Sequence, residues 1–240
     1  MLLCLFGAYD FPKSGSLNAQ SFLCLSLSVN FLDEIGQYMR FAHVAPFLSN
    51  LPEFHKIIAP SLVDVVAKRS LPNSATVFKT IRELETLNGT KAKGFSKNKK
   101  FGQDLWYNFI APTLKTSMSV ETWRKGSGKD IGSQCSKNKM RQNVYDVEVV
   151  KLLEKSFSYS KDHSKWGVSV NANVPAVCIG DINRQESQFK RGGGAVCIED
   201  MKLWKAFHAR TPRTFEKDST KGPKQKTKPT KRPKQPDNLI

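Results

Sequence analysis

The residues with the clearest capacity for chemistry are His163 and Lys165, within the run Asp162-His163-Ser164-Lys165-Trp166. Residues two apart on a strand face the same side, so an extended segment would project the imidazole and the ammonium into one site. A lysine can hold a non-bridging phosphate oxygen, and an imidazole can act as a nucleophile or as a proton donor. The pair therefore suits a phosphodiester, although a His-x-Lys triplet also arises often by chance. The spacing of His, Cys and carboxylates predicts no metal site, and no cofactor is expected.

The elements that must position this pair are strands mixed with helices. Alternation of apolar and polar residues, or short apolar runs, predicts strands over 22–29, 117–123, 165–170, 176–181 and 195–198. Asn30 is expected to cap a helix that carries Leu32 to Met39, and Asp200 one that carries Trp204. A third helix is predicted over 103–110, ending before Pro112, while 144–153 suits either a strand or a helix. The fold class is therefore mixed α/β or α+β.

Charge is concentrated in two segments of this 240-residue chain, whose formal net charge is +17. Residues 67–141 hold 16 basic and 5 acidic residues, a net charge of +11, and residues 217–240 hold 8 and 2, a net charge of +6. The second segment belongs to a Lys/Pro-rich tail, 213–240, that we expect to be disordered. The lysine run 91–100 is expected to decorate a loop beginning at Asn88-Gly89-Thr90. Such a basic chain favours polyanionic partners, and the tail is either a tether to them or an extension without selected function.

Several features leave two interpretations open. Asn88-Gly89-Thr90 is a candidate N-glycosylation site if the chain is secreted, but such triplets also occur by chance. Gly192 to Gly194 would bring backbone close to a phosphate or form a flexible turn. Four tryptophans could stack on bases, though packing in the core is their more usual role: Trp106, Trp123, Trp166 and Trp204.

The motifs Asp-His-Ser-Lys-Trp, Cys-Ile-Gly-Asp-Ile-Asn-Arg (178–184) and Arg-Gly-Gly-Gly-Ala-Val-Cys (191–197), in this order, resemble the C-terminal part of the deoxyribonuclease II family. Looser matches are Phe11-Pro12-Lys13-Ser14, the strand at 20–26 and the stretch 95–106. The resemblance covers about 9–212. It implies a phospholipase D-like sheet flanked by helices, one half of a pseudo-two-fold fold in which each half supplies one His-x-Lys to a shared site.

The resemblance also implies a reaction and site residues. It implies metal-independent hydrolysis of DNA at acidic pH to 3′-phosphate ends, in which one histidine attacks phosphorus and the other protonates the leaving oxygen. His163 and Lys165 match the family's second His-x-Lys, and Asn183 matches its phosphate-orienting asparagine. Cys178 and Cys197 match a family disulfide; taken without the resemblance, they are equally two buried thiols.

The sequence departs from the family in what it lacks. His43, His55 and His208 are not followed two residues later by lysine, so the first His-x-Lys is missing and the chain resembles a C-terminal half. The pairing of Cys4, Cys24 and Cys135 is not determined by the sequence.

We therefore expect a deoxyribonuclease II-like enzyme with DNA as its substrate, completed by a homodimer or by a separate N-terminal half. The alternative is a truncated, inactive homologue that binds DNA or other polyanions. The family implies a secreted or lysosomal location, although residues 1–8 make only a weak signal-like start. No apolar run approaches the roughly 18 residues of a membrane span.

Overall fold

The computed structural model describes residues 2–6, 17–47, 49–125, 128–138 and 141–211, and within them seven strands form one sheet. Its order is β3-β4-β11-β10-β9-β5-β6, and all neighbours are antiparallel except β5 and β6. The strands are β3 (Lys79–Glu85), β4 (Lys91–Lys97), β5 (Met118–Thr122), β6 (Val144–Asp146), β9 (Lys165–Ser169), β10 (Ala176–Gly180) and β11 (Gly193–Glu199).

Two small sheets accompany the large one. β1 (Leu2–Phe6) pairs with β2 (Phe22–Ser26), and β7 (Val149–Leu152) pairs with β8 (Lys155–Ser158). The ambiguous segment 144–153 is thus two strands, β6 and β7. The strands expected at 117–123, 165–170, 176–181 and 195–198 are confirmed as β5, β9, β10 and β11, and most of 22–29 as β2.

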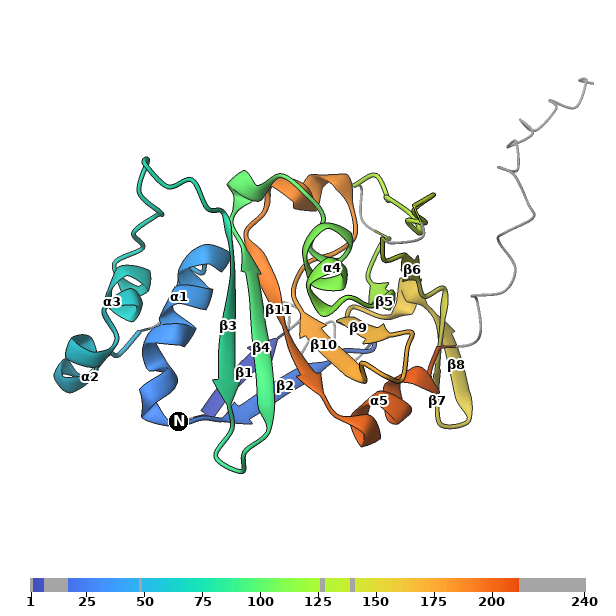
Figure 1. Ribbon diagram of the computed structural model, residues 1–240, viewed down its shortest axis with the longest axis horizontal. Helices are drawn as coiled ribbons and strands as arrows, with labels where there is room; N and C mark the ends of the chain where they lie inside the picture. The colour runs from blue at the N-terminus through green and yellow to red at the C-terminus, as the bar shows by residue number, and fades with distance from the viewer. Residues whose placement is uncertain (1, 7–16, 48, 126–127, 139–140, 212–240) are drawn as a thin grey trace, which may run out of the picture.

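Helices cover both faces of the sheet (Figure 1). A π-helical turn (Trp106–Ile110) continues into α4 (Ala111–Leu114) and packs on one face, against a buried cluster that includes Phe95 and Met118. The other face packs against α1 (Leu32–Ala42) over β4 and β11, and against α5 (Met201–His208) over β9 and β10. The helices α2 (Glu53–Ile58) and α3 (Pro60–Val66) lie outside α1 (Figure 1).

Short 3₁₀ turns connect several of these elements. They cover Val29–Phe31, Lys99–Phe101, Tyr159–Lys161 and Glu186–Lys190. The mixed α+β class, with a large and mostly antiparallel sheet flanked by helices, is confirmed. The pseudo-two-fold arrangement stays a prediction. No helix among the described residues is long and apolar enough to cross a membrane.

Two local expectations are wrong for identifiable reasons, and a third is confirmed. Asn30 does not cap α1; it lies in a 3₁₀ turn whose own cap is Ser28, since the Ser28 hydroxyl accepts from the Asn30 N–H at 3.3 Å. The third helix does not end before Pro112, because proline at the first turn of α4 has no helical N–H to lose. Asp200 does cap α5, where its carboxylate accepts from the Leu203 N–H at 2.7 Å.

The lysine run 91–100 is not a loop. Most of it forms β4, which follows the hairpin turn at 86–90, and Lys97 is fully buried at the end of that strand. Residues 212–240, which include the basic tail, and residues 7–16, which include Phe11-Pro12-Lys13-Ser14, lie outside the described residues.

Candidate functional site

Four neighbouring strands begin or end at the same end of the sheet, and this end is called the site edge. β4 ends there at Lys97, which pairs with Gly193 at the start of β11. β10 ends there at Gly180, and β9 begins there at Lys165. In Figure 1 this edge lies at the top, opposite the hairpin that joins β3 to β4. The sequence motifs that are far apart along the chain are therefore brought together by antiparallel pairing.

His163 lies just before β9. The expected alternation along a strand therefore does not determine whether its side chain faces the same side as that of Lys165. Its N–H donates to the Ala19 carbonyl at 2.8 Å, and its part-exposed ring lies 4.2 Å, between centroids, from the ring of Trp123. The Lys165 ammonium donates to the carbonyl of His163. The two residues are thus held together by a turn and a hydrogen bond rather than by the pleat of a strand.

Asp162 fixes the turn that carries His163. Its buried carboxylate accepts from the backbone N–H of Ser164 at 2.9 Å and from the Ser164 hydroxyl. A carboxylate that accepts from its own backbone two residues later forms an Asx turn. The polar residues on either side of His163 therefore shape its backbone.

Two buried lysines lie at this edge. Burial lowers the pKa of Lys165 to about 8, while Asp162 and Asp181 act in the opposite direction. Burial likewise lowers the pKa of Lys97 to about 8, opposed by Asp104 and Asp181. Both ammonium groups are therefore fully charged in mild acid and lose their charge as the pH rises through about 8.

Lys97 was not among the expected site residues. Its ammonium donates to the carbonyls of Gln188 at 3.0 Å, Phe189 at 3.2 Å and Arg191 at 2.5 Å. These three bonds anchor the loop that follows β10 and leads into β11. In the sequence this lysine belongs to the run 91–100 and to the stretch 95–106 that matches the family, and neither pattern indicates its burial.

Asn183 lies in that loop between two buried residues. Ile182 packs in the core beneath α4, and the N–H of Arg184 donates to the Thr122 hydroxyl at 3.1 Å. The Asn183 side-chain oxygen is buried and has no hydrogen-bond partner among the described residues. Its neighbours thus fix the position of Asn183.

A buried ion network lies behind Asn183. The Arg184 guanidinium is paired with Asp146, lies 3.8 Å from Asp104, and donates to the Gln134 side chain at 2.9 Å. Asp146 also lies 3.3 Å from Arg124. Sequence reasoning missed this network, because its members are spread over five separate segments.

The triple glycine does not form a flexible turn. Gly193 and Gly194 belong to β11, and Gly192 abuts the carbonyl of Ala42. A Cβ on Gly194 would overlap the carbonyl oxygen of Phe95, and one on Gly193 would lie 2.5 Å from the Asp181 carboxylate. Close packing of backbone and Asp181 therefore explains the absence of side chains here.

Cys178 and Cys197 form a disulfide between directly paired residues of β10 and β11, the pair that the resemblance implies. Cys135 is an exposed free thiol. Asn88 is exposed in the β3–β4 hairpin turn, at the end of the sheet opposite His163. Three of the four tryptophans, Trp106, Trp166 and Trp204, are buried in the core, whereas Trp123 contacts His163.

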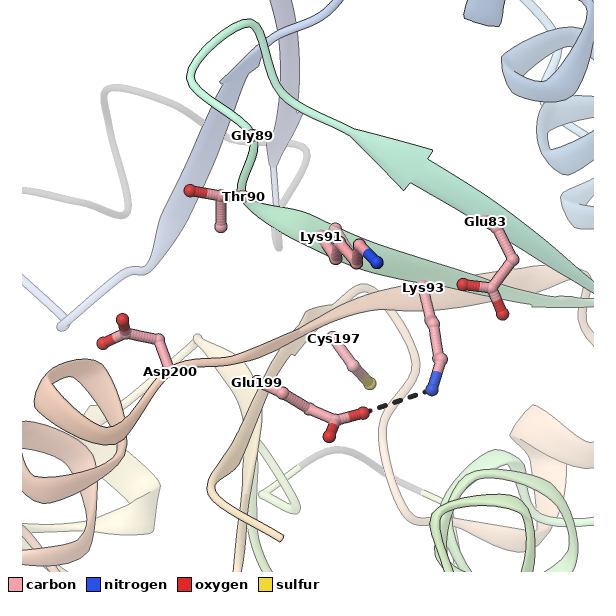
Figure 2. Close-up of a pocket in the computed structure, with 9 residues that line it drawn as sticks. Glu83, Gly89, Thr90, Lys91, Lys93, Cys197, Glu199 and Asp200 are labelled. Carbon is pink, nitrogen blue, oxygen red and sulfur yellow. Dashed lines mark hydrogen bonds and ion pairs between the residues drawn. The ribbon is translucent and has the colours of Figure 1, made fainter.

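A pocket of about 640 Å³ lies over β4 and β11, towards the hairpin end (Figure 2). Lys93 and Glu199 form an ion pair of 3.2 Å across it, with Glu83 and Asp200 nearby. His163, Lys165 and Asn183 do not line this pocket. Within the described residues no group of three or more His, Cys, Asp or Glu is placed to hold a metal ion.

The protein thus has a mostly antiparallel sheet flanked by helices. A histidine, two lysines and an asparagine lie at one end of its strands. The sequence model of the deoxyribonuclease II family matches residues 6–214, and the chain belongs to that family.

Relatives with nuclease names agree with this assignment. The chain is 39% identical over 202 residues to "Cell-death-related nuclease 7" of Caenorhabditis elegans, a match that covers 84% of this chain and 54% of the relative. It is 38% identical over 199 residues to "Deoxyribonuclease-2" of the same organism, covering 83% and 52%. It is 29% identical over 204 residues to "Deoxyribonuclease-2-beta" of Homo sapiens, covering 83% and 54%. The chain spans about half the length of the relatives it matches.

Proposed function

We propose that this chain supplies one half of a nuclease site that hydrolyses DNA phosphodiesters without a metal, at acidic pH, and leaves 3′-phosphate ends. The observation that carries the proposal is the hydrogen bond from the Lys165 ammonium to the backbone carbonyl of His163, which ties the two residues of the motif into one turn. Asn183 is assigned the role of orienting the phosphate through its side-chain NH2 group, which can donate to a phosphate oxygen. Family membership supports the substrate class.

The reaction that fits these groups has two displacements. An imidazole nitrogen attacks phosphorus, a P–N bond forms, and the bond from phosphorus to the 5′ oxygen breaks as a second histidine protonates that oxygen. Water then attacks the phosphohistidine, returns a proton to the second histidine and releases the 3′-phosphate. Lys165 balances charge on the non-bridging oxygens, and at pH 5 its ammonium is fully charged because its pKa is about 8.

The reaction needs a second His-x-Lys, and His163 is the one histidine of this sequence that is followed by lysine two residues later. A single copy of the sequence therefore carries one of the two motifs. We propose a second copy of this chain or a separate N-terminal half as the source of the other motif. Light scattering with and without a short DNA duplex distinguishes a homodimer from a monomer that needs another chain.

The test is nicking of supercoiled plasmid at about pH 5 in the presence of a chelator. We expect the wild-type chain to nick DNA and His163→Ala to lose that activity. His55→Ala, on α2 and far from β9 in the fold, is the matched control and should cut normally. Equal, measurable cleavage by wild type and His163→Ala, or cleavage abolished by the chelator, would refute the proposed chemistry. No cleavage by either chain would refute a second copy of this chain as the source of the other histidine.

The single His-x-Lys favours a second candidate function, binding of DNA without cleavage. In this case the basic residues of 67–141 would hold the polyanion, and affinity would fall steeply as salt is added. His163→Ala would leave this affinity unchanged. Fluorescence anisotropy with a labelled duplex at two salt concentrations, alongside the nicking assay, separates binding from catalysis.

We further propose that the chain passes through a secretory compartment, to the outside or to the lysosome. The disulfide between Cys178 and Cys197 suits an oxidising compartment. Asn88 would be glycosylated there: it is exposed, and its side-chain oxygen accepts from the Thr90 hydroxyl at 3.2 Å. Expression in a secreting eukaryotic host should give a mass decrease on glycosidase treatment that is absent in Asn88→Gln, and an unshifted wild-type chain would refute it.

A further inference from the structure

Trp123 is the half-buried tryptophan outside the core, and its ring contacts the histidine of the motif. The centroids of the indole and of the His163 imidazole lie 4.2 Å apart, and the two ring planes are inclined by 42°. Thr122, the last residue of β5, pairs with Lys165 at the start of β9. Continued along the two chains, this antiparallel register places Trp123 beside the residues just before Lys165. The contact between the two rings is thus a result of strand pairing.

The backbone of His163 is held by hydrogen bonds that do not act on its ring. Its N–H donates to the Ala19 carbonyl at 2.8 Å, and its carbonyl accepts from the Lys165 ammonium. The Asp162 carboxylate closes the turn by accepting from the backbone N–H two residues later at 2.9 Å. None of these three bonds acts on the side-chain torsions of His163, and an imidazole has several staggered rotamers open to it. The indole contact does act on those torsions.

The chain on either side of Trp123 is anchored, so the indole has a rigid support. The Thr122 hydroxyl accepts from the Arg184 N–H at 3.1 Å, which ties the end of β5 to the loop that follows β10. The buried Arg124 guanidinium donates to the Val147 carbonyl at 2.9 Å. Because both neighbours are held, Trp123 is placed to limit the movement of the imidazole.

Stacking of DNA bases, the other role open to this tryptophan, needs an exposed ring face. The indole of Trp123 is partly covered, and its buried Nε1 has no hydrogen-bond partner among the described residues. The imidazole also lies against the ring, so a base would compete with His163 for this position. The packing therefore favours a role of the indole towards the imidazole.

We propose that Trp123 is a positioning residue whose indole holds the His163 imidazole in one rotamer at the site edge. A ring nitrogen must approach phosphorus, or the leaving oxygen, along a defined line, and a rotamer fixed before substrate binds removes part of the cost of ordering. Trp123 itself does not touch the phosphate. The inference rests on the proposed function, in which His163 is one of the two reacting histidines.

The kinetic consequence is a loss in kcat rather than in binding. Trp123→Leu removes the aromatic ring, and Trp123→Phe restores a ring at the same place. In the nicking assay we expect Trp123→Leu to lower kcat roughly tenfold to a hundredfold, the scale of a misplaced reacting group, with KM unchanged. Trp123→Phe should recover most of this loss. A stacking platform for bases would instead raise KM, because it contributes to binding.

The orientation of the imidazole is measured by NMR on the full chain, without DNA. The three-bond couplings between the Hα and Hβ protons of His163 report its χ1 rotamer, and these signals are assigned by their loss in His163→Ala. We expect one rotamer in the wild type and in Trp123→Phe, and averaged couplings in Trp123→Leu.

Phe54→Leu is the matched control. Phe54 lies on α2, and its ring centroid is 4.0 Å from that of His55, so this substitution removes an aromatic ring beside a different imidazole. It should leave both the His163 couplings and kcat unchanged.

A single His163 rotamer in Trp123→Leu would overturn the proposal, as would a raised KM with unchanged kcat. If Trp123→Leu does not fold, Trp123→Met takes its place, because the flexible methionine side chain fills irregular gaps. Cross-relaxation between the indole and imidazole protons needs no variant, and its absence in the wild type also overturns the proposal. A chain that loses the ordered rotamer in Trp123→Leu, but whose wild type does not cut plasmid, refutes the nuclease proposal and leaves the ordering of His163 by Trp123 intact.

Discussion

Glu121 offers the sharpest test of the electrostatics beneath the site. It lies in β5 opposite Trp166 and is completely buried, and neither carboxylate oxygen has a hydrogen-bond partner among the described residues. Burial first, and then the charge of Asp162, raise its pKa from 4.5 to about 10. The folded protein therefore keeps this carboxyl protonated across the physiological range.

The sign of the effect on stability follows from proton linkage. Below pH 4.5 Glu121 is protonated in both the folded and the unfolded chain, so its titration does not change the free energy of unfolding. Between pH 4.5 and about 10 only the unfolded chain ionises, so the free energy of unfolding falls by about 1.4 kcal/mol for each pH unit. At pH 7 the accumulated loss is about 3 kcal/mol.

Glu121→Gln removes this titration. A buried glutamine also lacks partners, but that cost does not change with pH. The melting temperature of the variant, relative to wild type, should therefore rise by roughly 6–12 °C between pH 4.5 and pH 7, at about 2–4 °C for each kcal/mol.

Scanning calorimetry of both chains at several pH values measures this difference. Glu83→Gln, an exposed position on β3, is the control and should show none. Parallel curves for wild type and Glu121→Gln would refute the assignment of a buried, protonated Glu121.

Three other substitutions test the packing of the site, each by urea unfolding. Arg184→Ala leaves buried carboxylates without their counter-charge and should cost about 3–5 kcal/mol, whereas exposed Arg69→Ala should cost little. Gly194→Ala forces a methyl group onto the carbonyl of the neighbouring strand and should cost at least about 1–3 kcal/mol. Replacing Cys178 and Cys197 together by alanine opens a loop with a sequence separation of 19 and should cost about 3 kcal/mol, with a smaller loss pointing to a disulfide absent in solution.

Local sequence signals were sufficient for the strands nearest the site and for helix α5. β9, β10 and β11 show short apolar runs bounded by turn residues, and Asp200 carries the side-chain oxygen that caps α5. These features depend on residues within a few positions of one another, so they can be read without the fold. The motifs that match the deoxyribonuclease II family lie in the same stretch, which is why family membership was also predictable.

The buried charges were not predictable in this way. Lys97 belongs to a run of lysines that suggests a solvated loop, and its partners lie 91 to 94 positions away in sequence. Glu121 sits among residues that predict a strand but do not show that both faces of that strand are covered. Arg184 lies within a family motif whose asparagine drew attention instead. Burial at these positions is set by pairing between distant strands.

The strand order has a consequence for how the site is assembled. β9, β10 and β11 are consecutive both in the chain and in the sheet, so this antiparallel meander can form from contacts that are short in sequence. β4 pairs with β11, the outer strand of this meander, through Lys97 and Gly193. The long stretch of chain between these two residues must therefore close into a loop before β4 can join. We therefore expect Lys165 and Asp181 to meet early in folding. The loop that Lys97 anchors, with Arg191, should become ordered last.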